Sequence, residues 1–223
     1  MDIHIGVIPD GNRRWARKRG LKASLGHYFG AKKVEEFLKW CLELGIKKVT
    51  FYLLSNENVK KRSKEEVEYI FKLLENYLKK WEKEKLFEKY EVRVKFLGDF
   101  RKVPNALIKL MKNVMKKTEK YNKFFLNLLV GYSGFYDVLQ AFKKIVRKRV
   151  KITEKTLKQN LLINDDIDLI IRTGGFSRLS NFAPLQSSYA EIYVLKKYWP
   201  DITKRDLINA LKWFKSQKRN FGK

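Results

Sequence analysis

Two short segments of the sequence gather residue types that bind anionic groups. One is Asp10-Gly11-Asn12-Arg13-Arg14-Trp15-Ala16, and the other is Arg172-Thr173-Gly174-Gly175, which leads on to Arg178 and Ser180. Arginine offers a fork of N–H donors that fits phosphate oxygens, and glycine lets the backbone approach a ligand closely. A lone carboxylate among such donors, here Asp10, is expected where a metal ion bridges it to phosphate. Each segment therefore predicts a phosphate or diphosphate site.

Each segment also has a plainer interpretation. The first fits a capped turn before a basic surface helix, and the second fits a Gly-Gly turn with exposed arginines. Neither matches the glycine-rich loops G-x-x-x-x-G-K-[ST] or G-x-G-x-x-G, so nucleotide-loop mechanisms have no support. The run Asn164–Asp168 has the wrong spacing for a D-D-x-x-D magnesium motif and reads as a solvated loop. His4 and His27 are the only histidines, which excludes a histidine metal cluster.

The elements that must position these segments alternate along the chain. Short apolar runs predict strands, amphipathic runs predict helices, and Ser63 with Glu66 predicts a capping box at one helix start. Buried strands separated by helices predict an α/β fold with a mostly parallel sheet, whose ligands bind at the carboxyl ends of the strands. The predicted strands are 3–9, 47–55, 91–97, 124–130, 167–171 and 190–194. The predicted helices are 29–44, a long one that follows Ser63 and carries Val67 to Trp81, 104–117, 135–148, 153–162 and a last one from Thr203.

Composition sets the broad class of the protein. Its 223 residues fit a single domain, 1–223, and its formal charge is +26. That charge is compatible with nucleic acid, an anionic membrane or phosphorylated substrates, but most lysines alternate with glutamates on predicted helices and read as a solvated surface. One cysteine, Cys41, excludes an internal disulfide framework. No apolar run reaches the ~18 residues of a membrane span, so we expect a cytoplasmic protein.

The run Ile8–Ala16 resembles the opening signature of the cis-prenyltransferases, the undecaprenyl diphosphate synthase family. That resemblance implies a six-stranded sheet, a hydrophobic tunnel for the growing chain, magnesium as cofactor and usually a homodimer. The likeness continues in order through Gly26-His27, Gly30, Ser55, Glu57-Asn58, Leu97-Gly98-Asp99, Leu126-Asn127, Asp168–Gly175, Arg178–Phe182, Gln186, Tyr189-Ala190-Glu191, Trp199-Pro200-Asp201 and Arg219–Gly222.

The resemblance also implies roles for individual residues. The implied substrates are isopentenyl diphosphate and an allylic prenyl diphosphate, which an enzyme of this family joins with release of diphosphate. The implied catalytic residues are Asp10, Asn12 and Asn58, with Asn58 on a flexible closing loop. Gly11, Asn12, Arg13 and Arg14 would bind the allylic diphosphate, with His27 lining the same pocket, and Arg172, Arg178 and Ser180 would bind that of isopentenyl diphosphate. Further implied substrate contacts are Trp15, Ser55 and Glu57, and the implied metal ligands are Asp10 and Glu191.

Several positions depart from the family pattern. Val59 stands where the closing loop normally has tryptophan, and Phe176 stands where a glutamate is usual. Further departures are Ala23, Phe135, Leu185 and Asn220-Phe221-Gly222. They leave the catalytic class in place and open the questions of product length and partner arrangement.

Two other functions remain as alternatives at this point. A catalytically silent accessory subunit of a cis-prenyltransferase complex would have no need of Asp10, which this chain retains. A nucleic-acid binder is prompted by the charge but lacks a recognisable binding motif, so we expect no nucleic-acid partner. A peripheral contact with the membrane is a further option if the products are long.

Overall fold

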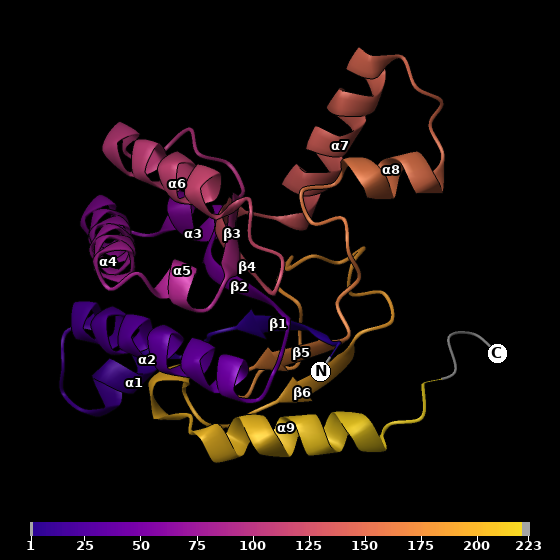
Figure 1. Cartoon of the computed structure of the whole chain (residues 1–223). Coiled ribbons are helices and arrows are strands. Elements are labelled where there is room, and N and C mark those ends of the chain that lie inside the picture. Colours follow the sequence, from indigo (N-terminus) through magenta and orange to yellow (C-terminus); the bar gives the residue numbers. More distant parts are fainter. Residues whose placement is uncertain (1, 220–223) are drawn as a thin grey trace.

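Within residues 2–219, the part of the chain that the computed structural model describes, six parallel strands form one sheet. Their order is β3-β4-β2-β1-β5-β6 (Figure 1). This confirms the α/β fold with a six-stranded sheet, and every strand pair is parallel. The strands are β1 (His4–Ile8), β2 (Lys48–Ser55), β3 (Val92–Leu97), β4 (Phe124–Tyr132), β5 (Leu169–Arg172) and β6 (Glu191–Val194).

The helices differ from the predicted ones mainly near the site. Helix α2 begins at Ala23, six residues before the predicted start at 29, because Gly26 and Gly30 weaken the helical pattern in the sequence. Any side chain at Gly26 would collide with the Asn12 carbonyl, so glycine lets α2 pass close to α1. The helices are α1 (Asn12–Lys18), α2 (Ala23–Glu43), α3 (Asn56–Lys61), α4 (Lys64–Lys83), α5 (Leu86–Lys89), α6 (Asn105–Thr118), α7 (Gly134–Lys148), α8 (Glu154–Asn160), η1 (Trp199–Asp201) and α9 (Lys204–Ser216).

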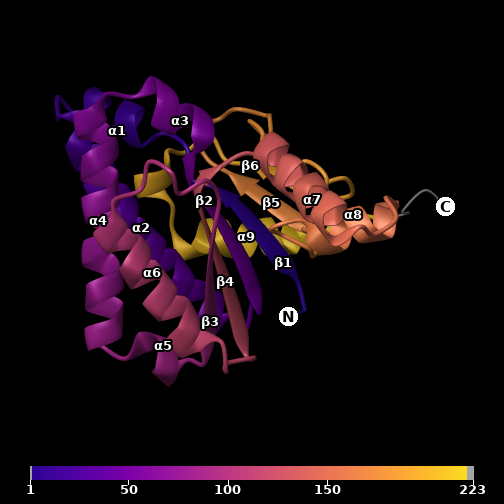
Figure 2. The ribbon, with the colours of Figure 1, turned by 90° about the horizontal axis from the view of Figure 1, so that it is seen from above.

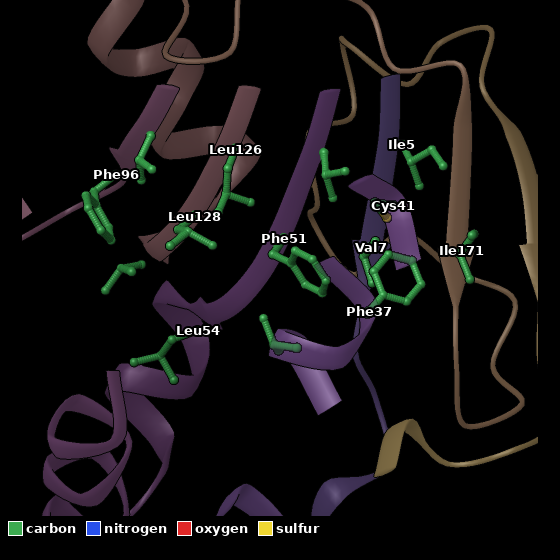
Figure 3. Close-up of a cluster of buried hydrophobic side chains, with 14 of the residues drawn as sticks. Ile5, Val7, Phe37, Cys41, Phe51, Leu54, Phe96, Leu126, Leu128 and Ile171 are labelled. Atoms are coloured by element: carbon green, nitrogen blue, oxygen red, sulfur yellow. The ribbon is translucent and has the colours of Figure 1, made fainter. Parts of the chain in front are cut away.

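Helices α2, α4 and α6 pack against one face of the sheet (Figure 2). The main core lies between them and the strands, where Phe37 of α2 meets Phe51 of β2 edge-on at 5.5 Å between ring centroids (Figure 3). Cys41 is fully buried there, as predicted, and burial raises the pKa of its thiol. This layer fixes the position of α2, which runs alongside the site.

The opposite face of the sheet has a smaller core and a projecting pair of helices. Tyr52, Tyr132 and Phe182 form the centre of that core. Helices α7 and α8 pack mainly against each other and extend away from the body of the molecule (Figure 1). Within residues 2–219 no helix is long and apolar enough to cross a bilayer.

The register of the strands brings three loops to the same edge of the sheet. Ile8 at the end of β1 lies opposite Arg172 at the end of β5, and Ser55 at the end of β2 lies opposite Tyr132. The segments that follow β1, β2 and β5 therefore meet at the carboxyl edge of the sheet. The anion-binding residues predicted from the sequence lie in these segments.

Candidate active site

An open cavity of about 750 Å³ occupies the carboxyl edge of the sheet. Cationic side chains dominate its lining, because Arg13, Arg14, Arg17, Arg62 and Arg172 face it against the carboxylates of Asp10 and Glu57. This balance favours an anionic ligand. Of the predicted site residues, the cavity brings together Asp10, Gly11, Asn12, Arg13, Arg14, His27, Ser55, Glu57, Asn58, Arg172 and Ser180.

The carboxylate of Asp10 links the two segments singled out in the sequence. Arg172 Nη2 donates to Asp10 Oδ2 at 2.9 Å, and Arg14 Nη2 donates to Oδ1 at 3.2 Å. Arg172 is only 3% exposed, and its Nη1 also donates to Ser180 Oγ at 2.9 Å and to the carbonyl of Arg178. Two guanidinium groups are thus held at the cavity by bonds formed before any ligand arrives.

Two glycines at this edge are required by their close contacts. Gly11, with φ of +107°, stands at the start of α1, where a side chain would meet the ring of Tyr198. Gly174, with φ of +83°, leaves no room for a side chain beside Arg14. Its carbonyl accepts from Arg14 Nη1 at 2.9 Å. Both positions use the left-handed conformation that glycine adopts without strain.

A second cluster, centred on Glu66, was not foreseen as part of the site. Its Oε1 accepts from His27 Nε2 at 2.9 Å and lies 3.2 Å from Arg62 and 3.8 Å from Arg13. Ser63 Oγ accepts from the Glu66 amide as predicted, but the Glu66 carboxylate turns to these partners, so the predicted capping box is only half formed. The sequence holds no signal for this, because the packing of α2 against α4 creates it.

The ionisation of this cluster follows from burial and charge. Burial lowers the pKa of His27 below its ordinary value, although the hydrogen bond to Glu66 opposes that shift. Burial raises the pKa of Glu66, but His27, Arg62 and Arg13 together outweigh it and leave the pKa below its usual range. We therefore assign a neutral His27 that donates to an ionised Glu66 near neutral pH.

The predicted closing loop is a short helix, α3, in this structure. Ser55 Oγ caps it by accepting from the amide of Asn58 at 3.0 Å. Glu57 Oε1 accepts from Asn181 Nδ2 at 2.9 Å, which ties α3 to the segment after β5. Burial raises the pKa of Glu57, but the hydrogen bonds from Asn181 and the backbone outweigh it, so the pKa lies below its usual value.

Three predicted site residues do not line the cavity. Trp15 is buried on the far side of α1, where its Nε1 donates to Asp201 Oδ1 at 2.6 Å. Arg178 is exposed and is not among the residues that line the cavity. Glu191 pairs in register with Leu169, and Leu169 with Ile5, five residues or roughly 16 Å of extended chain before Asp10. The roles given to these three residues stay predictions.

A separate, small apolar pocket of about 90 Å³ adjoins the polar cavity. The two share Pro9, Asn12, His27 and Leu53 in their linings. At the junction, Asn12 Oδ1 is buried and has no hydrogen-bond partner among the described residues. Residues of β2, α2 and α4 surround the pocket down to Trp81. A polar cavity beside an apolar pocket is an arrangement that favours a ligand with a charged head and an apolar tail.

Comparison with known proteins decides the family. The family model described as putative undecaprenyl diphosphate synthase matches residues 8–222. The chain belongs to the undecaprenyl diphosphate synthase family. It is a prenyltransferase, which confirms the resemblance noted in the sequence.

Relatives in this family are similar over nearly the whole chain. An isoprenyl transferase from Aquifex pyrophilus is 42% identical over 99% of this chain and 95% of its own length. A tritrans,polycis-undecaprenyl-diphosphate synthase (geranylgeranyl-diphosphate specific) from Archaeoglobus fulgidus is 41% identical over 96% of this chain and 89% of its own. These matches favour a catalyst over a silent accessory subunit of the undecaprenyl diphosphate synthase family.

Solved structures of the same family share the fold. A probable undecaprenyl diphosphate synthase from Campylobacter jejuni has a TM-score of 0.85 and 32% identity, and covers 100% of this chain and 99% of its own. Lavandulyl diphosphate synthase from Lavandula x intermedia, in complex with dimethylallyl diphosphate, has a TM-score of 0.92 and 31% identity over 99% of this chain and 98% of its own.

The oxygen donors at the cavity fit the magnesium ion that this family implies. Within residues 2–219 no group of three or more His, Cys, Asp or Glu side chains could hold a metal ion by itself. Magnesium commonly takes one or two carboxylates and completes its shell with water and substrate phosphates. Asp10, which faces the cavity at 30% side-chain exposure, is suited to supply that one carboxylate.

Proposed function

We propose that the enzyme condenses isopentenyl diphosphate with an allylic prenyl diphosphate to make a Z-polyprenyl diphosphate. The observation that supports this best is the arginine-lined cavity beside an apolar pocket, with four residues common to the two linings. The cavity suits two diphosphates, and the pocket suits a hydrocarbon tail, which gains about 0.8 kcal/mol for each methylene buried.

Each segment at the cavity takes one diphosphate in this proposal. Residues Gly11–Arg14 bind the allylic diphosphate, beside His27 held by Glu66. Arg172 and Ser180, already joined at 2.9 Å, bind the diphosphate of isopentenyl diphosphate together with Arg178. A magnesium ion bound at Asp10 would supply charge neutralisation for the departing allylic diphosphate. The arginines supply the same stabilisation from fixed positions.

The bonds exchanged balance without a further reactant. The C–O bond of the allylic diphosphate breaks and its electron pair leaves with diphosphate. The terminal double bond of isopentenyl diphosphate then forms the new C–C bond, and a proton is lost from the condensed chain. Asp10 is paired with two arginines, and the lowered pKa of Glu57 makes that group a weak base. We assign the proton to the released diphosphate, with Asn12 and Asn58, which both line the cavity, as the side chains that would orient it.

The apolar pocket would hold the growing chain. A second small apolar pocket of about 70 Å³ lies next to it, and Trp81 is the residue common to both linings. The Trp81 ring is buried and packs edge-on against Phe87 at 6.1 Å. We propose that the first pocket is the upper part of the tunnel and that Trp81 closes it, which would limit the length of the product.

The exposed face of α7 supports a homodimer. Phe135, Leu139, Phe142 and Val146 follow helical spacing on one side of α7, and Phe135 is 82% exposed. A contiguous apolar face of this kind is typical of a protein–protein contact. Phe135 is also a departure from the family pattern, and it extends this face.

Residues Asn220–Gly222, which the family resemblance links to a neighbour's active site, lie outside the described residues. A cytoplasmic location and a peripheral membrane contact stay predictions.

One incubation tests the proposed function. Purified protein is mixed with labelled isopentenyl diphosphate, magnesium and dimethylallyl, farnesyl or geranylgeranyl diphosphate in turn, and products are sized after hydrolysis. We expect elongated products that vanish with a chelator and return with magnesium. Because the Archaeoglobus fulgidus relative is named as geranylgeranyl-diphosphate specific, we expect that primer to work best. Failure to extend any of the three primers would contradict the proposal.

A further inference from the structure

The ring of Phe176 contacts one arginine from each anion-binding segment. The guanidinium carbon of Arg14 lies 4.5 Å from its centroid, and that of Arg178 lies 4.1 Å away. Both distances are within the range of a cation–π contact. Phe176 follows Gly174 and Gly175, whose left-handed backbone turns the chain out of β5, and it is 37% exposed. The ring is therefore placed where both diphosphate-binding segments pass.

The two arginines differ in their other partners. Arg14 is also held by Asp10, by the Gly174 carbonyl and by the Tyr198 ring at 5.2 Å, and it lines the cavity. The guanidinium of Arg178 makes no hydrogen bond or ion pair within residues 2–219, and it does not line the cavity. Its contact with Phe176 is what orients it.

The backbone of Arg178 is nevertheless fixed beside the cavity. Its carbonyl accepts from Arg172 Nη1, and the same nitrogen donates to Ser180 Oγ at 2.9 Å. Tyr52 adds a hydrogen bond from its hydroxyl to the Ser180 carbonyl at 3.3 Å. A rotation of the Arg178 side chain, with no movement of the backbone, would bring its guanidinium to a ligand bound at Arg172 and Ser180.

We propose that Phe176 is a positioning residue that holds Arg178 outside the cavity until isopentenyl diphosphate binds. Arg178 then exchanges the ring for the diphosphate, to which a charged donor binds more strongly. This inference rests on the proposed role of Arg178 at that substrate. The ring contact stabilises the ligand-free position of Arg178. Part of the binding free energy of isopentenyl diphosphate is therefore spent on breaking this contact, which raises Kd roughly two- to fivefold for an exposed cation–π pair.

Phe176→Leu tests this, because leucine keeps apolar bulk and removes the aromatic face. Binding of isopentenyl diphosphate is measured by calorimetry with magnesium and no allylic substrate. We expect Kd to fall roughly two- to fivefold, with the melting temperature unchanged. Tyr198→Leu is the matched control, since it removes a ring from Arg14 alone and should not tighten binding.

A double-mutant cycle with Arg178→Ala completes the test. Arg178→Ala should weaken binding of isopentenyl diphosphate, and Phe176→Leu should then have no further effect. If Arg178→Ala weakens binding but Phe176→Leu does not tighten it, the inference is wrong and the proposed function stands. A tightening that persists without Arg178 would also overturn the inference. If Arg178→Ala leaves binding unchanged, both the role of Arg178 and the inference fail.

Discussion

Arg172 Nη2 lies 2.9 Å from Asp10 Oδ2, so the end of β5 is tied to the loop after β1 by an ion pair at the floor of the cavity. The arginine side of the pair is 4% exposed and the aspartate side is 30% exposed. Asp10 therefore has two duties in this arrangement. It compensates a buried charge, and it presents a carboxylate to the cavity.

Replacing Asp10 should affect both turnover and stability, because its carboxylate has both roles. We expect Asp10→Asn to lower turnover by ~10²-fold or more, the loss typical of a key electrostatic group. Because Arg172 then lacks a counter-charge, the free energy of unfolding should also fall by on the order of 1–3 kcal/mol, less than for a fully buried pair. Steady-state kinetics and urea unfolding measure the two effects. Asp165→Asn, which removes an exposed partner of Lys48, should change neither appreciably; turnover near wild type in Asp10→Asn would refute the assignment.

Asn58 and its neighbour Val59 should respond differently to substitution. Asn58 faces the cavity, whereas Val59 packs at the edge of the main core. We expect Asn58→Ala to lower kcat at least ~10-fold while α3 remains capped, because Ser55 accepts from the backbone amide of residue 58. Val59→Trp should be tolerated and should lower the KM of the allylic substrate by adding aromatic area. Kinetics with a fixed primer compares the two, and a harmless Asn58→Ala would show that α3 has no part in the chemistry.

Trp81 offers a direct test of what limits the product. Trp81→Ala would join the two apolar pockets that now share only this residue. We expect longer products from the same primer, at a stability cost of about 3–5 kcal/mol for the lost ring. Trp81→Phe keeps most of the ring and should leave the product length near that of the wild type. Chromatography of the dephosphorylated products gives the answer, and an unchanged length in the alanine variant would move the limit elsewhere.

The apolar face of α7 should control assembly. We expect the wild type to be dimeric by light scattering, and the double substitution Leu139→Glu with Val146→Glu to give monomers, since both positions are exposed and lie about two turns apart on the same helix face. Arg147→Glu on the neighbouring face of α7 is the control and should remain dimeric. A monomeric wild type at micromolar concentration, or a dimer that survives both glutamates, would exclude this face.

His4 makes stability depend on pH at the opposite edge of the sheet. Burial lowers its pKa from 6.5 to about 4, with the Asp166 carbonyl and Thr50 hydroxyl 2.8 and 2.7 Å from its ring nitrogens. Below pH 6.5, the pKa of His4 in the unfolded chain, the unfolded chain binds a proton at His4 that the folded protein does not bind. The free energy of unfolding therefore falls as the pH decreases toward 4. From about pH 7 to about pH 5 this site should lose about 2 kcal/mol. Urea unfolding should show a smaller loss in His4→Gln; an equal loss would assign the effect to other groups.

What the sequence could and could not predict follows from the range of the interactions. Asp10 and Arg172 each follow an apolar strand, so their meeting was predictable from the rule for parallel sheets. The sequence around Glu66 predicts only a local helix cap. The contact between Glu66 and His27 depends on how two long helices pack, which no local pattern shows. Trp15 sits among site residues in the sequence, yet the direction of α1 turns it toward Asp201. Position along the chain gives the edge of the sheet, whereas the direction of a side chain depends on tertiary packing.

The shared boundary between the polar cavity and the apolar pocket has a kinetic consequence for a growing chain. While the pocket still has room, burial of each added five-carbon unit would stabilise the bound chain by roughly 4 kcal/mol. That gain would slow dissociation of the chain by about three orders of magnitude per unit. Early intermediates would then stay bound through many rounds. Once the tail reaches Trp81, a further unit adds no burial and its crowding weakens retention, so the residence time of the chain would decide when synthesis stops.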